Sequence, residues 1–178
     1  MAVIEAIATS YLEADYASVT FSGIPGTYEH LQLRISAKSD RTSATNDDIE
    51  LTFNGTTTPY CHHRMTGQDA TPADDDTASD TFIKVSSIQS AAVASGAANY
   101  GSVIVDIFDY ADDGNRGTTV VGLSGVNQAK PQDIGRNRVS FFTGLWSNLD
   151  DVTSIALVPS GGSNFVRGSE FTLYGIQE

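Results

Sequence analysis

The amino-acid sequence predicts an all-β fold: an antiparallel, jelly-roll-like β-sandwich of about ten short strands in a single domain, residues 1–178. Three observations support this expectation. Apolar and polar residues alternate with a period of two in several segments, as on a strand with one buried face. Turn-forming Gly, Pro, Asn and Asp recur between these segments. Charged residues make up only 18% of the chain, below the roughly 25% that is usual in globular proteins.

The clearest alternation lies in residues 31–38, and a second one lies in residues 49–53. In both segments every other residue is apolar, so each strand turns one face to a core. We expect the two apolar faces to pack against each other inside the sandwich. The residues concerned are Leu31, Leu33, Ile35, Leu51 and Phe53.

The pair Asn54-Gly55 follows the second of these segments. Both residues tolerate a positive φ, which predicts a β-hairpin whose return strand is residues 60–65. Residues 56–59 lengthen the connection, so a tight two-residue turn is one option and a longer loop is the other.

The remaining strand candidates are short segments rich in apolar, β-branched and aromatic residues between turn signals. Two of them, residues 101–110 and 138–146, carry apolar side chains on both faces. Such strands are covered on both sides, by a second sheet, a loop or a partner. The other candidates are residues 3–9, 18–21, 81–87, 118–123, 154–158 and 170–176.

The longest polar stretch is residues 66–80, which includes the consecutive acidic residues Asp74, Asp75 and Asp76. We expect an exposed loop there, because this stretch has no apolar face to bury. Residues 87–98 are rich in alanine but contain a glycine and few charged side chains, so they do not predict an amphipathic helix.

The balance of charge excludes two classes of partner. The chain has 22 acidic and 10 basic residues, a formal net charge of −12. Nucleic acid would be repelled, and so would an anionic membrane surface. No segment approaches the ~20 apolar residues of a membrane span, and the first residues do not resemble a secretory signal. The single cysteine rules out an internal disulfide.

No pattern of residues indicates an enzyme or a cofactor. A hydrolase needs a nucleophile with a positioned base, and His30, His62 and His63 stand outside any catalytic motif. The string Gly122-Leu123-Ser124-Gly125 lacks the spacing of a nucleophile elbow, which requires a glycine both two residues before and two residues after the serine. We therefore expect a protein without catalytic residues.

Cys61, His62 and His63 form the most suggestive local cluster for a metal. Alternation points Cys61 and His63 to the same side of a strand, and both can bind zinc. No second ligand pair follows them, so we favour a strand with one buried face, with zinc between subunits as the alternative. The acidic runs at residues 74–76 and 112–113 lack the spacing of a calcium loop and are expected to be solvated.

Phe141, Phe142 and Trp146 are candidate interface residues. They lie close together in an apolar segment, where burial in the core or against another subunit is favoured over display as a platform for a sugar.

Four landmarks in order along the chain carry a resemblance. They are FSGIPGTY at residues 21–28 leading into LQLR, IELTFNG at 49–55, GLWS at 144–147 and FTLYGI at 171–176. Together they resemble a loosely defined group of structural proteins of tailed-phage virions. Each landmark has an ordinary role in a turn or strand, so the resemblance concerns the fold first.

This resemblance implies a β-sandwich part of a capsid decoration (cement) protein or of a tail fibre, frequently a homotrimer. The first expectation is a decoration protein that is made in the host cytoplasm, binds the major capsid protein and stabilises the outer surface of the shell. The alternative is a tail-fibre, adaptor or receptor-binding module that recognises a host surface through loops such as residues 66–80. A glycan-binding module is the third interpretation.

Overall fold

The computed structural model describes residues 3–68, 71–92, 99–111, 114–127 and 137–177, which form twelve strands and no helix. The all-β prediction is confirmed, with slightly more strands than the ten expected. Within these residues there is accordingly no helix long and apolar enough to cross a membrane. The strands are β1 (Val3–Tyr11), β2 (Val19–Ser22), β3 (His30–Ser39), β4 (Asn46–Phe53), β5 (Tyr60–Gln68), β6 (Thr71–Asp80), β7 (Ile83–Ser90), β8 (Gly101–Phe108), β9 (Thr118–Asn127), β10 (Asn137–Trp146), β11 (Ser154–Pro159) and β12 (Glu170–Gln177).

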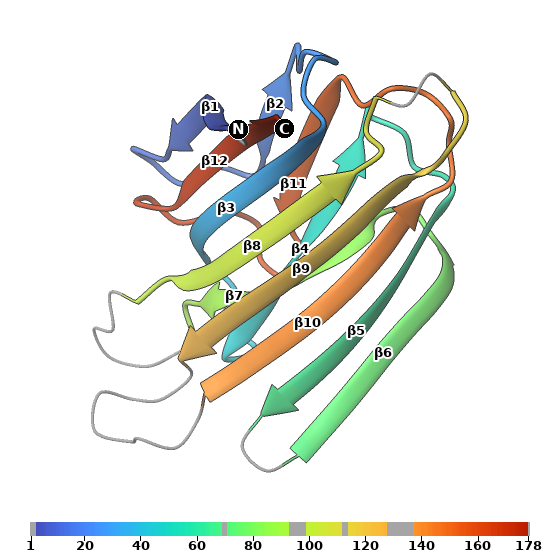
Figure 1. Cartoon of the computed structure of the whole chain (residues 1–178). Helices are drawn as coiled ribbons and strands as arrows, with labels where there is room; N and C mark the ends of the chain where they lie inside the picture. The colour runs from blue at the N-terminus through green and yellow to red at the C-terminus, as the bar shows by residue number, and fades with distance from the viewer. Residues whose placement is uncertain (1–2, 69–70, 93–98, 112–113, 128–136, 178) are drawn as a thin grey trace.

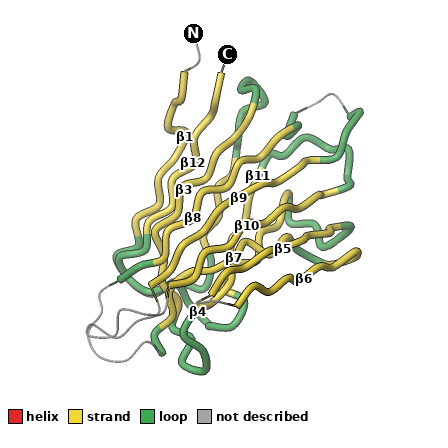
Figure 2. The backbone as a smooth tube through the Cα atoms, turned by 60° about the horizontal axis from the view of Figure 1, so that its bottom comes forward, coloured by secondary structure: helices red, strands yellow, loops and turns green. Residues whose placement is uncertain are grey.

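The strands form two layers that are joined at one place (Figure 1). The larger layer has the order β1-β12-β3-β8-β9-β10-β5-β6, and the smaller layer has the order β2-β11-β4-β7. Neighbours within each layer are antiparallel. A short parallel pairing of Lys38 and Ser39 with Gln89 and Ser90 joins β3 to β7. Figure 2 shows the start of β1 and the end of β12 side by side.

The core lies between the two layers and confirms the expected strand faces. Leu31, Leu33 and Ile35 of β3 and Leu51 and Phe53 of β4 are all buried in one hydrophobic cluster. The alternation in each strand is therefore in the register that the sequence predicts, because a shift by one residue would turn these side chains outward.

The turn predicted at Asn54 and Gly55 is present, but the predicted hairpin is wrong, because the strands before and after the turn do not pair with each other. Asn54 and Gly55 both have a positive φ, 52° and 66°, and the amide of Thr56 donates to the carbonyl of Phe53 at 3.0 Å. The chain then crosses between the layers, so β4 pairs with β7 and β11 while β5 pairs with β10 and β6. The Asn54 side chain ties this turn to the start of β11, since it bonds to residues 151, 153 and 154.

The predicted loop of residues 66–80 is also wrong. Residues 66–68 continue β5, and Thr71–Asp80 form β6, the edge strand of the larger layer. The sequence of β6 is a poor strand former by composition. Its backbone is nevertheless held by the antiparallel ladder with β5, and its Asp75 side chain is held by ion pairs described below.

Candidate interaction surface

Four exposed apolar side chains lie in one row across the outer face of the larger layer. Ile104 of β8 is paired with Leu123 of β9, Leu123 with Phe141 of β10, and Phe141 with Met65 of β5. Their exposed fractions are 45%, 59%, 44% and 59% in that order. Directly paired residues point to the same face of a sheet, so these side chains form a continuous strip. We call Ile104, Leu123, Phe141 and Met65 the apolar row.

The apolar row ends in opposite charges. Arg34 of β3 is paired with Ile104, and Asp74 of β6 is paired with Met65. Both charged side chains are exposed. The Arg34 guanidinium lies 4.9 Å from the ring centroid of Tyr174, and its Nε donates to the Gln32 side chain at 2.9 Å. These contacts hold the guanidinium against the sheet surface over β3 and β12, at the end of the apolar row.

A protruding valine adjoins the apolar row between two glycines. Val139 of β10 is 62% exposed and is paired with Gly125 of β9 and Gly67 of β5. A methyl group added at Gly125 would meet no atom within 4 Å. Residues of β5, β6, β9 and β10 line an open, mostly apolar groove here of about 770 Å³. The outer face of the larger layer therefore carries a groove as well as an apolar surface.

The structure separates the three predicted interface residues. Phe142 and Trp146 are fully buried in the core of this chain, whereas Phe141 lies in the apolar row. The sequence predicts the other members of the row only in part. Residues 101–110 and 138–146 show apolar residues on both faces, but the alignment of Ile104, Leu123 and Phe141 depends on strand pairing. No local pattern encodes that pairing.

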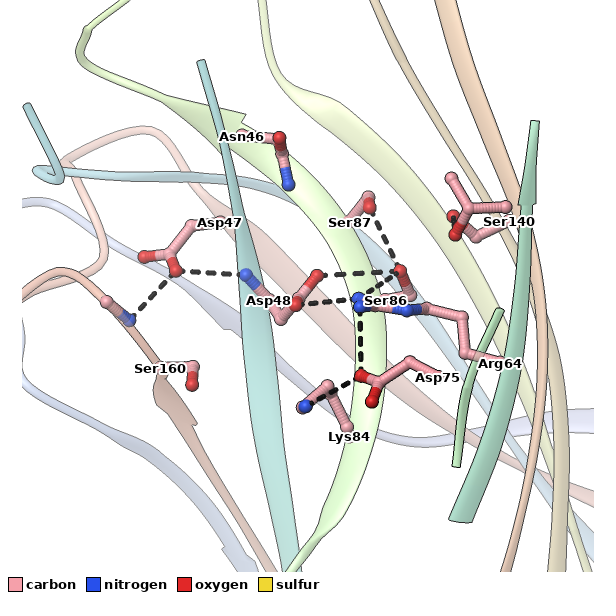
Figure 3. A network of polar contacts seen from close by, with 12 residues as sticks. Asn46, Asp47, Asp48, Arg64, Asp75, Lys84, Ser86, Ser87, Ser140 and Ser160 are labelled. Atoms are coloured by element: carbon pink, nitrogen blue, oxygen red, sulfur yellow. Dashed lines mark hydrogen bonds and ion pairs between the residues drawn. The ribbon is translucent and has the colours of Figure 1, made fainter. Parts of the chain in front are cut away.

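A network of polar contacts links the two layers at the edge that carries β6 (Figure 3). The Arg64 guanidinium of β5 bonds to the carboxylate of Asp48 in β4 at 2.7 Å and to that of Asp75 in β6 at 3.1 Å. Lys84 of β7 bonds to the same Asp75 carboxylate at 2.9 Å. The hydrogen bond from Lys84, followed by the nearby charges of Lys84 and Arg64, lowers the pKa of Asp75 against the opposing effect of burial.

This network also fixes which acidic residues of β6 face outward. Asp75 points inward to Arg64 and Lys84, so its neighbours Asp74 and Asp76 are exposed on the outer face. The expectation of three solvated aspartates therefore holds for two of them. Of the other acidic run, residues 112–113 lie outside the described residues.

The cluster at Cys61, His62 and His63 alternates as expected. Cys61 is half-buried and His63 exposed, whereas His62 points inward, is buried, and stacks on Phe82 with ring centroids 6.1 Å apart. Burial, with the positive charge of Lys84, lowers the pKa of His62. Among the residues described, no group of three or more His, Cys, Asp or Glu side chains is placed to hold a metal ion.

No family model matches this chain, and no curated protein matches it either. Among solved structures, a weak similarity is found to the crystal structure of a protein of unknown function from Shewanella oneidensis MR-1. The two sequences are 11% identical, the TM-score is 0.23, and the alignment covers 98% of this chain and 79% of the other. A similarity at this level carries no argument about fold or function.

Proposed function

We propose that this chain is a structural protein of a tailed-phage particle, a decoration protein that binds the shell of major capsid protein on its outer surface. The observation that carries the proposal is the apolar row on the outer face of the larger layer, because such a row indicates that the chain works as part of a larger assembly of protein chains. An isolated exposed leucine needs no explanation, but a contiguous apolar strip on a soluble protein marks an interaction surface.

Two further features support a structural role. The apolar row lies on regular, paired strands, which hold a docking face more rigidly than loops do. The net charge of −12 favours a position outside the shell, because an acidic surface is repelled by packaged nucleic acid. The four sequence landmarks that resemble tailed-phage structural proteins narrow the proposal to this kind of particle.

The proposal is tested by purifying the particles of the virus that encodes the chain and measuring its copy number relative to the major capsid protein by mass spectrometry. A copy number that follows that of the capsid lattice supports decoration. A few copies per particle would favour the tail-fibre or receptor-binding alternative. Absence of the chain from purified particles would overturn both.

A further inference from the structure

We propose that the apolar row is a two-fold interface with a second copy of this chain. The inference rests on the proposed role of the row as an assembly surface and names what covers it. The resulting dimer differs from the homotrimer that the family resemblance implies, because a surface that pairs with the same surface of a second copy joins two chains.

The arrangement of side chains in the row is self-complementary. The order across six strands begins with one cation, continues with four apolar residues and ends with one carboxylate. A two-fold axis parallel to the strands, above the gap between β9 and β10, brings the same face of a second copy onto this one. Opposed residues are then Leu123 with Phe141, Ile104 with Met65, and Arg34 with Asp74, each pair occurring twice.

Charge selects this axis over the other simple arrangement. An axis across the strands would place each residue of the row opposite itself, so that Arg34 would meet Arg34 and Asp74 would meet Asp74, and like charges opposed at an interface repel. With the axis along the strands, the apolar pairs lie at the centre and the opposite charges lie at the rim. This is the usual anatomy of a protein interface.

The positions on either side of the row agree with the same axis. Val139 and Gly125 lie two residues along their strands from the row. About the proposed axis, the protruding Val139 faces Gly125 of the second copy, over which there is open space. On the opposite side of the row, again two residues along the strands, His63 faces Asp106 of the second copy. An imidazole N–H can donate to a carboxylate. The neighbouring opposed pair is Gln32 with Asp76, again a donor with an acceptor. None of these pairs sets like charges against each other.

The size of the face is sufficient for a specific contact. Six strands ~4.8 Å apart and about eight residues long give a face of roughly 750 Å². A standard stable interface buries about 800 Å² per partner. Two sheets can pack face to face at ~10 Å with their strands nearly aligned, which is the geometry that this axis produces.

The first test is the mass of the purified chain in solution by sedimentation equilibrium, in about 0.15 M salt to screen the net charge. We expect twice the chain mass of 18.9 kDa. Leu123→Asp should give a monomer, because it places two carboxylates at the centre of the interface. The matched control is Leu149→Asp, since Leu149 is 52% exposed and lies outside the outer face of the larger layer. This variant should remain a dimer.

The second test exchanges the rim charges. Arg34→Asp and Asp74→Arg should each weaken the dimer at least about tenfold, because each sets like charges against each other twice. The double variant should restore wild-type affinity. Within one chain these residues are five strand spacings apart, about 24 Å, so the rescue cannot come from pairing inside a chain.

Three results would overturn the inference. They are a wild-type mass of one chain, a wild-type mass of three chains, and a double variant no better than the single ones. These results concern the free chain, whereas the proposed function is judged from the content of particles. Failure of one is therefore distinguishable from failure of the other.

Discussion

At the scale of the residue, three aromatic rings pack together inside the core. Trp146 of β10 is fully buried, with its ring centroid 5.4 Å from that of Phe53 in β4 and 6.2 Å from that of Tyr60 in β5. The hydroxyl of Tyr60 accepts from the Phe53 amide at 2.8 Å. These contacts join strands of both layers.

We expect Trp146→Ala to lower the free energy of unfolding by about 3–5 kcal/mol, because it leaves a cavity between the layers. Denaturant unfolding followed by far-ultraviolet circular dichroism measures the change, with Leu149→Ala, at an exposed side chain outside the apolar row, as the control. An equal loss in the two variants would contradict the assignment of Trp146 to the core.

Two glycines of β9 should respond in opposite ways to the same substitution. A methyl group at Gly122 would collide with the Phe142 ring and lie 2.6 Å from the Ile104 carbonyl oxygen, whereas one at Gly125 meets nothing within 4 Å. Gly122→Ala should therefore destabilise the fold by about 1–3 kcal/mol. In the monomer, measured at low chain concentration, Gly125→Ala should be neutral or slightly stabilising, because it limits the freedom of the unfolded chain. Thermal unfolding of the two variants makes the comparison, and similar melting temperatures would refute it.

Buried His62 predicts a specific dependence of stability on pH. Its lowered pKa means that the unfolded chain takes up a proton below about pH 6.5 while the folded chain does not. The stability that depends on neutral His62 is thus present above pH 6.5 and is lost as the pH falls towards the lower folded pKa.

Replacing this histidine by phenylalanine, His62→Phe, keeps the ring stacked on Phe82 and removes the titration. Between pH 7 and pH 5, the unfolding free energy of the variant should fall less steeply than that of the wild type, by up to about 1.4 kcal/mol per pH unit. The exposed His63→Phe variant is the control, and every protein is measured at a concentration low enough to be monomeric, because His63 faces the proposed dimer interface. Parallel curves for the wild type and His62→Phe would show that His62 does not titrate differently in the two states.

At the scale of the element, β6 shows where sequence patterns fail. Its residues have low strand propensity, so a loop is the natural prediction, yet the strand forms because β5 offers a free edge and Asp75 is held by Arg64 and Lys84. Such long-range contacts cannot be read from a local window. By contrast, β3 and β4 were predictable because one face of each is apolar at every second residue.

The variant Asp75→Asn should loosen β6 without changing the shape of the side chain. We expect faster amide hydrogen exchange in β6 and a loss of stability of at most about 1 kcal/mol, because the carboxylate is partly exposed to solvent. Asp76→Asn, on the exposed side of the same strand, is the matched control. Unchanged exchange in β6 of the Asp75 variant would show that the ladder with β5 alone holds the strand.

At the scale of the whole molecule, the fold class followed from composition and alternation, but the surface did not. The prediction that residues 101–110 and 138–146 are apolar on both faces was available from the sequence. That these apolar residues form one exposed row could not be predicted, because the row depends on the strand order β8-β9-β10-β5, which aligns side chains from four strands. The Asn54-Gly55 turn illustrates the same limit, because a turn sequence does not say which layer the chain enters next.

The outer face of the larger layer is assigned a role in assembly. One measurement tests it most directly: a density map, by electron cryo-microscopy, of particles that contain the chain. We predict that Leu123 and Phe141 are covered by protein, against a second copy related by a two-fold axis along the strands. A map in which both side chains face open solvent would contradict the account.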